Sequence, residues 1–227
     1  MELDNPVWSC LATRHAHLAE GREFARRYPP DVSPLAGVLS PAPAHVAALE
    51  ALFDVGDEFA TAGKFVPKLS SDWQSLLEAH LVQMVRSDSA PAPEGDVEVT
   101  PLKAEDIGEM LALVELTRPG PFRVRTVELG TFIGIRDEGR LVAMTGERMW
   151  IGDYREISAV CTHPDVQGRG YARALIGRTL NRIIRAGQIP FLHAESSNVR
   201  AIALYQALGF VVRAEYPLLF ARRTKAP

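Results

Sequence analysis

The sequence is poor in cysteine, in aromatic residues and in long apolar runs, and these shortages exclude several classes of protein. Two cysteines, Cys10 and Cys161, among 227 residues exclude a disulfide framework, a four-cysteine zinc site and an iron–sulfur cluster. No apolar run approaches the roughly 20 residues of a membrane span, and the first residues lack the basic and apolar segments of a signal peptide. We therefore expect no metal, no membrane partner and a cytoplasmic location.

The composition that remains is that of a folded protein with an uneven charge. Hydrophobic residues make up 47% and charged residues 23% of the chain, which excludes disorder throughout. Residues 1–96 hold 7 Lys and Arg against 14 Asp and Glu, whereas the rest holds 18 against 14. The two parts are either differently solvated surfaces, or the basic part receives an anionic ligand. No long basic run with interleaved aromatics occurs, so nucleic acid is not an expected partner.

A small, polar, Pro/Gly-rich stretch at 87–96, SDSAPAPEGD, predicts a linker. It separates an N-terminal unit, residues 1–86, from residues 97–227. No internal repeat is present. Within the N-terminal unit the patterns predict helices over 11–27 and 45–53, a strand over 58–61, and a helix or strand over 73–85.

After the linker the periodicity becomes clear. The segment 171–186 carries Ala172, Leu175, Ile176, Leu180 and Ile183 on one helical face. The element order is β-α-β-β-β-α-β-α-β-β, which predicts an α/β (α+β) sandwich with strands of mixed direction. The predicted strands are 97–102, 131–135, 140–150, 155–162, 190–194, 210–212 and 216–221, and the predicted helices are 104–116, 171–186 and 198–208.

The loop before the second of these helices has the features of an anion site. Gly168 and Gly170 leave the backbone bare, so that N–H groups and the helix N-terminus can approach a diphosphate, and Arg169 and Arg173 can add charge. No Lys follows the glycines, which excludes a P-loop, and Arg173 stands where the dinucleotide fingerprint needs Gly or Ala. Two glycines before a helix also occur in tight turns.

Two segments together resemble the GNAT superfamily of N-acetyltransferases. Residues 167–172, QGRGYA, are similar to its Q/R-x-x-G-x-G/A motif, and residues 198–210, NVRAIALYQALGF, to its N-x-x-A-x-x-L-Y-x-x-x-G-F signature. Residues 156–164 further resemble the glycine-N-acyltransferase-like branch. The resemblance covers 97–227 and implies a mixed, mostly antiparallel central sheet flanked by helices. The N-terminal unit is then an additional α/β unit, with a degenerate half-copy of the same fold as one interpretation.

The resemblance also implies a role for each residue in these segments. The backbone of Val160, Cys161 and Thr162 is expected to hold the pantetheine arm, with the Val160 N–H on the thioester oxygen. Tyr205 stands at the general-acid position, or it is a core tyrosine; Asn198 binds pantetheine, caps its helix, or does both. The residues expected to bind acetyl-coenzyme A are Val160, Cys161, Thr162, Gln167, Gly168, Arg169, Gly170, Tyr171, Ala172, Asn198 and Ala201.

The general base is the least determined role. Glu156 lies eleven residues before Gln167, which resembles the position where some members of the superfamily carry a catalytic glutamate. Strand alternation predicts that it shares a face with Val160. Glu147 on the preceding strand is the alternative. A carboxylate in an apolar strand is costly without a partner, so each acts either as the base or in an ion pair with an arginine such as Arg148 or Arg155.

Cys161 and His163 are two residues apart and would share a strand face. No third group that could orient the imidazole is evident, so a covalent acetyl-cysteine is not the favoured interpretation.

The leading hypothesis is an acetyl-coenzyme A-dependent N-acetyltransferase with direct attack by a primary amine in a ternary complex. The alternatives are a non-catalytic coenzyme A-binding sensor or interaction module, and an acyltransferase that uses a longer acyl-coenzyme A. The acceptor is a small-molecule or peptide amine, and by analogy the stretch 118–125 shapes its side of the cleft. The sequence does not indicate an oligomeric state.

Overall fold

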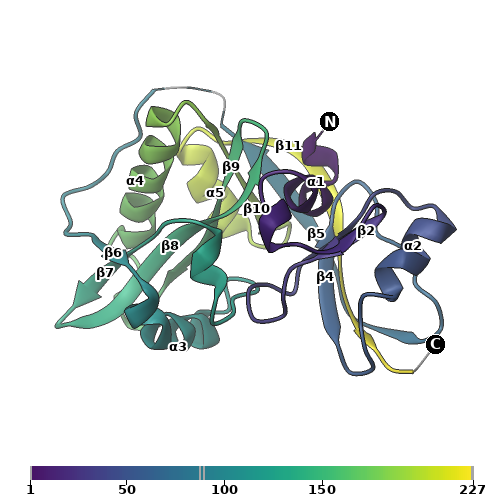
Figure 1. Cartoon of the computed structure of the whole chain (residues 1–227). Helices are drawn as coiled ribbons and strands as arrows, with labels where there is room; N and C mark the ends of the chain where they lie inside the picture. Colours follow the sequence, from purple (N-terminus) through teal and green to yellow (C-terminus); the bar gives the residue numbers. More distant parts are fainter. Residues whose placement is uncertain (1, 87, 89, 226–227) are drawn as a thin grey trace.

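One eight-stranded sheet runs through the computed structural model, which describes residues 2–86, 88 and 90–225 (Figure 1). All neighbouring strands in it are antiparallel except β9 and β10. The strand order is β4 (Glu58–Ala62), β11 (Val211–Arg223), β5 (Trp73–Val85), β10 (Ile189–Glu195), β9 (Tyr154–Thr162), β8 (Arg140–Ile151), β7 (Phe132–Asp137) and β6 (Thr100–Leu102). The predicted mixed, mostly antiparallel sheet flanked by helices is confirmed.

Helices cover both faces of this sheet. The helices α4 (Tyr171–Arg185) and α5 (Val199–Ala207) pack on one face, where Ile176 and Leu180 meet Ile157 and Leu192. The helices α3 (Ile107–Thr117) and α1 (Pro6–Ala12) pack on the other face. Every third or fourth residue of α4 is apolar, so one face of this helix is buried, while Arg173 and Arg185 are exposed.

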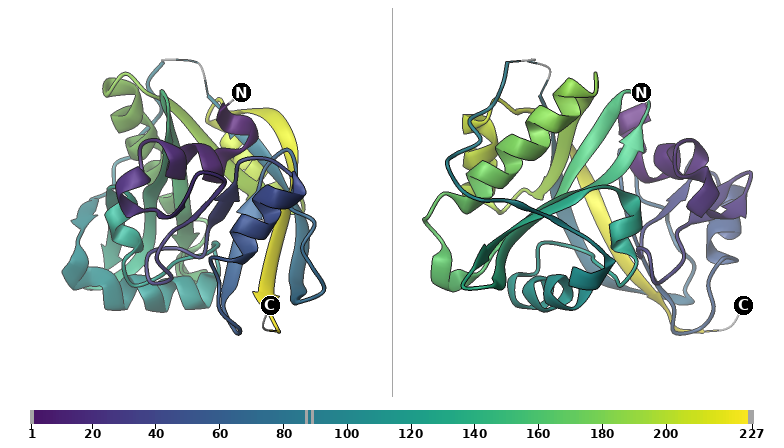
Figure 2. Two further views of the ribbon diagram at one scale, coloured as in Figure 1. Left: turned by 45° about the vertical axis from the view of Figure 1, so that its right-hand side comes forward. Right: turned by 60° about the vertical axis from the view of Figure 1, so that its left-hand side comes forward.

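Strands from the N-terminal stretch lie inside the same sheet. β5 is hydrogen-bonded to β10 on one side and to β11 on the other, and β4 pairs with the far edge of β11. Figure 2 shows the C-terminal strand, in yellow, beside these blue strands. A separate three-stranded sheet is formed by β1 (Glu20–Arg22), β2 (Ala25–Arg27) and β3 (Ala36–Val38), with α2 (Pro43–Glu50) packed beside it.

The division into residues 1–86, 87–96 and 97–227 stays a prediction. Part of the predicted linker, residues 87 and 89, lies outside the described residues. The part around Ala92 packs on α4, because the Asn181 side chain bonds both the N–H and the carbonyl of Ala92, at 2.8 and 2.9 Å. This segment therefore follows the surface of α4.

Several predicted elements differ from the structure. The helix expected over 11–27 was wrong: α1 ends at Ala12, and a hairpin of β1 and β2 follows. Gly21 has φ +92° in this hairpin, and a Cβ there would meet the Ala25 carbonyl, so the chain turns where a helix would continue. The two strands expected at the C-terminus are one strand, β11, with a register shift between Val212 and Ala214. Within the described residues no helix is long and apolar enough to cross a membrane.

Short 3₁₀ helices connect these elements. They are η1 (Glu2–Asp4), η2 (Ala16–Leu18), η3 (Ala104–Asp106), η4 (Thr126–Leu129) and η5 (Pro164–Val166).

The feature that positions the site is the separation of β9 from β10. These parallel strands pair only from Tyr154 to Glu156 on β9, and then diverge. Just beyond, Ala159 has φ +52°, and the pairing of β9 with β8 shifts register there. The sheet is therefore open over the last residues of β9.

Candidate active site

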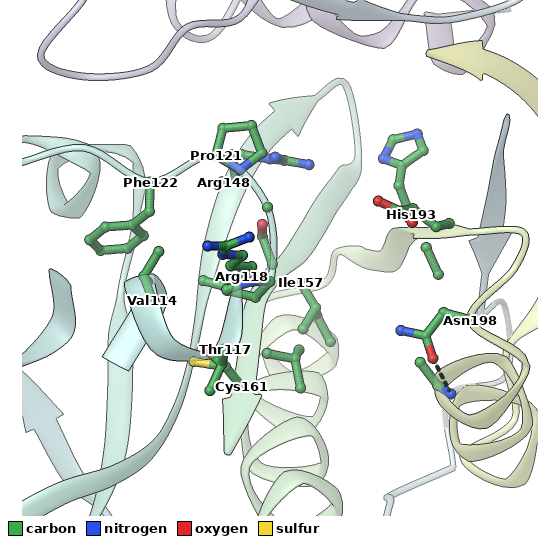
Figure 3. A pocket seen from close by; sticks show the side chains of 18 of the residues that line it. Val114, Thr117, Arg118, Pro121, Phe122, Arg148, Ile157, Cys161, His193 and Asn198 are labelled. Carbon is green, nitrogen blue, oxygen red and sulfur yellow. Dashed lines mark hydrogen bonds between the residues drawn. The ribbon is translucent and has the colours of Figure 1, made fainter. Parts of the chain in front are cut away.

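A cavity of about 1110 Å³ lies where β9 and β10 separate. One side, the glycine-loop wall, consists of the end of β9, the β9–α4 loop and α5. The opposite side, the apolar wall, is built by α1, β4, β5 and β11. Figure 3 shows Arg118 and Arg148 on one side of this cavity and His193 and Asn198 on the other. The apolar wall includes Val7, Leu35, Ala60, Leu81, Leu218 and Phe220.

The β9–α4 loop forms an open main-chain cradle at the start of α4. Gly168 and Gly170 have φ +83° and +80°, and a Cβ at either position would meet nothing within 4 Å. Glycine is required there by backbone conformation, and the space before it is free for a ligand. Gly170 is also the N-cap residue of α4, so the unpaired N–H groups of the first turn lie beside the cradle. These features fit a diphosphate.

Most residues expected at this cradle do line the cavity. They are Gln167, Gly168, Gly170, Tyr171 and Ala172. Arg169 does not line it, because its guanidinium is exposed and 3.2 Å from Asp137. Arg173 does, and so does Arg200, whose Nη1 is 3.5 Å from Gln167 Oε1. Sequence reasoning did not single out Arg200, although it lies within the second signature.

The end of β9 contributes Val160, Cys161 and Thr162 to the cavity. Ala159 and Val160 have no register partner on β8 or β10, so this stretch of backbone is free of strand pairing. The prediction that Glu156 and Val160 share a face was wrong. Val160 packs with Ile157 beneath α4 and α5, because the bulge at Ala159 reverses the alternation.

The thiol of Cys161 is not arranged as a nucleophile. Burial raises the pKa of Cys161 to about 11, so the thiol stays protonated at neutral pH. His163 turns away into the next loop, where its Nδ1 accepts from the Asp165 N–H at 3.2 Å. The two side chains therefore do not form a thiol–imidazole pair.

Tyr205 and Asn198 bring polar groups from α5 to the cavity. Tyr205 is 7% exposed, and its hydroxyl has no hydrogen-bond partner among the described residues. Burial raises the pKa of Tyr205 to about 12, so it is a protonated donor at neutral pH. Asn198 caps α5, as predicted, by accepting from the Ala201 N–H at 3.1 Å. Its Nδ2 amide remains available to a ligand, and Ala201 lines the cavity too.

Glu156 is fully buried, and arginine and histidine groups use both of its oxygens. Arg148 donates to it through Nε at 2.8 Å and Nη2 at 2.7 Å, and His193 Nδ1 lies 2.8 Å from Oε1. Burial by itself would raise the pKa of Glu156, but the charge and hydrogen bonds of Arg148 outweigh it and lower the pKa to about 2. The predicted ion pair with Arg148 is thus confirmed. A carboxylate held in this way is a poor proton acceptor near neutral pH.

Glu147 is also buried in an ion pair. Arg182 of α4 donates to it at 2.6 Å, and Arg155 Nε lies 3.5 Å away. Neither Glu147 nor Glu156 lines the cavity. The base role of either residue stays a prediction that this geometry does not favour.

Two further groups line the cavity, one expected from the sequence and one missed by it. Loop 118–123, which connects α3 to η4, lines the cavity as the expected acceptor-side segment. His193 lines it as well, although its sequence signal is only one polar residue in an apolar strand. Among the described residues no cluster of His, Cys, Asp and Glu could hold a metal ion.

Comparison with known proteins supports the resemblance read from the sequence. Residues 132–218 match the family model described as FR47-like protein. A putative acetyltransferase of the GNAT family from Novosphingobium aromaticivorans DSM 12444 is 33% identical, with a TM-score of 0.91, over 99% of this chain and 100% of that one. A GCN5-related N-acetyltransferase from Kribbella flavida shares the fold, with 14% identity and a TM-score of 0.65 over 97% and 95% of the chains.

A shorter match is to the L-amino acid N-acyltransferase MnaT of Escherichia coli (strain K12). The two sequences are 38% identical over 60 residues, which is 26% of this chain and 35% of that protein. The match therefore spans about a third of that relative's length.

Proposed function

The chain belongs to the GNAT family of acetyltransferases, and on this premise we propose that it transfers the acetyl group of acetyl-coenzyme A to a primary amine. The family implies acyl transfer from acyl-coenzyme A, so the chain is an acyl-coenzyme A-dependent N-acyltransferase. The choice of acetyl, the direct attack and the role of each residue are the proposal. The acceptor is an amine of a small molecule or a peptide.

One observation carries the proposal. An unpartnered Tyr205 hydroxyl and an open main-chain cradle at Gly168 and Gly170 face one cavity, where β9 leaves β10. A diphosphate-bearing thioester needs such donors at one end and a proton donor at the reacting sulfur. The Tyr205 hydroxyl has no protein partner among the described residues and is not shut off from the cavity, so it is free to donate to a bound ligand.

The residues of the glycine-loop wall would hold the co-substrate. Residues 167–172 would bind the pyrophosphate, with Arg173 near an outer phosphate. The backbone at the end of β9, residues 160–162, of which Val160 has no strand partner, and the Asn198 amide would bind the pantetheine arm. The Val160 N–H would donate to the thioester oxygen, where negative charge develops during the reaction.

The reaction needs two proton transfers. The bound thioester supplies the acetyl group: the amine nitrogen bonds to the carbonyl carbon, and the carbon–sulfur bond breaks. Tyr205 donates its hydroxyl proton to the departing sulfur. The excess proton on the nitrogen passes to water in the cavity, and Tyr205 regains a proton from water. The proposal does not give the base role to Glu156 or Glu147, because arginines already hold both carboxylates.

Calorimetry with acetyl-coenzyme A, followed by measurement of free thiol release over a panel of amines, tests this function. We expect binding in the micromolar range and release that depends on an amine. Binding without release over a broad panel would instead favour a non-catalytic sensor. Faster release from benzoyl- or longer-chain thioesters than from acetyl-coenzyme A would overturn the choice of acetyl.

A further inference from the structure

The ion pair of Arg148 and Glu156 lies at the point where the sheet opens. Glu156 is the last residue of β9 that pairs with β10, and it stands four residues before Val160. Arg148 lines the cavity and its side chain is 15% exposed, whereas Glu156 is 0% exposed. The carboxylate therefore lies behind the guanidinium, and the guanidinium is the group that a ligand can reach.

The hydrogen bonds around His193 define which of its ring nitrogens donates to Glu156. Gln83 Oε1 accepts from Arg213 Nη1 at 2.8 Å, so the amide nitrogen of Gln83 is the group that faces His193 Nε2, at 3.0 Å. Nε2 is therefore the acceptor, and the proton is on Nδ1, where it is donated to Glu156. Both nitrogens of the His193 ring are thus engaged, and the ring holds Glu156 in one orientation.

Arg148 is consequently fixed, yet it retains free donors. Its Nε and Nη2 are bound to Glu156, while Nη1 has no partner among the described residues and is not shut off from solvent. A guanidinium held on one edge by a carboxylate offers its remaining N–H groups in a fixed direction, which suits an incoming carboxylate. Arg118 and Arg123, on loop 118–123, also line the cavity and form no ion pair with a described residue.

The acidic residues of the cavity do not cancel this positive region. The Glu58 carboxylate is bound by Arg222. Glu115 and Glu195 are exposed side chains at the ends of α3 and β10. The only cation with a rigid, buried support in the described cavity lining is Arg148.

Beside Arg148 the cavity is apolar. Phe220 faces Ala60 on β4 and Leu77 on β5 in the sheet register, so these side chains share the face that lines the cavity. Val7 and Leu35 continue this surface, and they belong to the same core cluster as Met149, the neighbour of Arg148. A ligand bound to Arg148 thus has an apolar surface next to it.

We infer that Arg148 binds a carboxylate of the acceptor, that Glu156 and His193 position its guanidinium, and that the acceptor is an α-amino acid with an apolar side chain. This inference rests on the proposed function, because it concerns the amine of that reaction. It assigns to Glu156 a positioning role in place of proton abstraction, and it assigns the apolar wall to the side chain of the acceptor.

Matched amines test the inference. For leucine, methionine and phenylalanine, acetyl transfer is measured for the L-amino acid, its amide and the amine that lacks the carboxylate. We expect kcat/KM of each amino acid to exceed that of its two analogues by roughly tenfold to a hundredfold, the range for hydrogen bonds to charged groups. Glycine should be a poorer acceptor than all three, because it leaves the apolar wall uncovered.

Paired variants separate positioning from proton abstraction. Arg148→Gln would leave Glu156 buried and unpaired and could unfold the protein, so Arg148→Gln is combined with Glu156→Gln. We expect the double variant to raise KM for L-leucine roughly tenfold or more, and to remove the preference for L-leucine over 3-methylbutylamine. The control combines Arg136→Gln with Asp106→Asn. These two residues form an ion pair with an N···O distance of 2.6 Å, and neither lines the cavity, so this variant should show neither change.

Each result of these experiments supports or overturns a particular part of the inference. Equal use of acids, amides and simple amines would overturn the inference while the transferase function stands. Loss of kcat for all amines alike in the double variant would return Glu156 to proton abstraction and overturn its positioning role. If no amine is acetylated, calorimetry measures whether L-leucine binds to the coenzyme A complex. Binding that is lost in the Arg148 variant would support the carboxylate site without the transferase function. No binding would overturn both.

Discussion

The two walls of the cavity are assembled in different ways. The glycine-loop wall comes from two nearby segments, residues 160–172 and 198–205, and much of it is main chain. The apolar wall joins α1, β4, β5 and β11, which are separated by up to two hundred residues along the chain. Local sequence therefore specifies the wall proposed to hold the co-substrate, while the wall proposed to face the acceptor exists only after the N-terminal strands enter the sheet.

The largest effect is expected from a side chain placed in the main-chain cradle of the glycine-loop wall. Gly170→Glu adds a side chain and a negative charge where N–H groups face an anion. We expect acetyl-coenzyme A affinity to fall by roughly a hundredfold or more, since charge-assisted hydrogen bonds are lost and like charges approach. Calorimetry measures the loss. Gly187→Glu is the matched control, because Gly187 has φ +72°, equally open space and a place at the far end of α4. Equal loss in both variants would mean that backbone strain, and not the cradle, is responsible.

Mild acid should destabilise the folded chain through His15, a buried residue of the N-terminal stretch. Burial lowers the pKa of His15 to about 4 from an ordinary 6.5. Below pH 6.5 the unfolded chain takes up a proton at His15 that the folded chain accepts only near pH 4. The free energy of unfolding therefore falls across this window, by about 3 kcal/mol in total.

Urea unfolding at several pH values measures this change. His15→Gln should flatten the dependence between pH 6.5 and 4. Glu156, whose pKa is lowered to about 2, adds a second loss as the pH falls from about 4.5 toward 2. An unchanged slope in His15→Gln would contradict the assignment of the first window.

Tyr205→Phe separates catalysis from co-substrate binding within the glycine-loop wall. It removes the proton donor but keeps the ring that packs near Phe210. We expect kcat to fall roughly tenfold or more with acetyl-coenzyme A affinity nearly unchanged. Tyr154→Phe, which alters a tyrosine outside the cavity lining, serves as control. Full activity in Tyr205→Phe would remove Tyr205 from the mechanism.

The smallest effect is expected at the rim of the cradle. Arg173→Gln should weaken acetyl-coenzyme A binding only a few fold, because an exposed charge is screened by water and salt. The effect should shrink further at high salt. Arg185→Gln, on an exposed part of the same helix, should change the affinity less. Equal effects from both would point to the general field of α4 and not to a phosphate contact.

Particular residues show how far the sequence could go. The cap at Asn198, the cradle glycines and the strand–loop–helix order follow from interactions within a few residues, so pattern and propensity predict them. An ion pair of Glu156 with Arg148 could be predicted as one alternative, but the contact with His193, 37 residues away, and the bulge at Ala159 that changes which side chains share a face could not. The helix expected over 11–27 was wrong because tertiary contacts at the β1–β2 hairpin outweigh a weak local pattern.

The sequence by itself determined the family, the α/β sheet and the cradle, since these depend on short segments whose backbone conformation their own residues specify. Only the tertiary structure decided that β5 lies between β10 and β11, that Arg148 and not its partner Glu156 lines the cavity, and that an apolar wall completes it. The physical reason is that burial and ion pairing depend on which distant strands meet. No local pattern encodes these contacts between distant strands. They form because they lower the free energy of the whole chain.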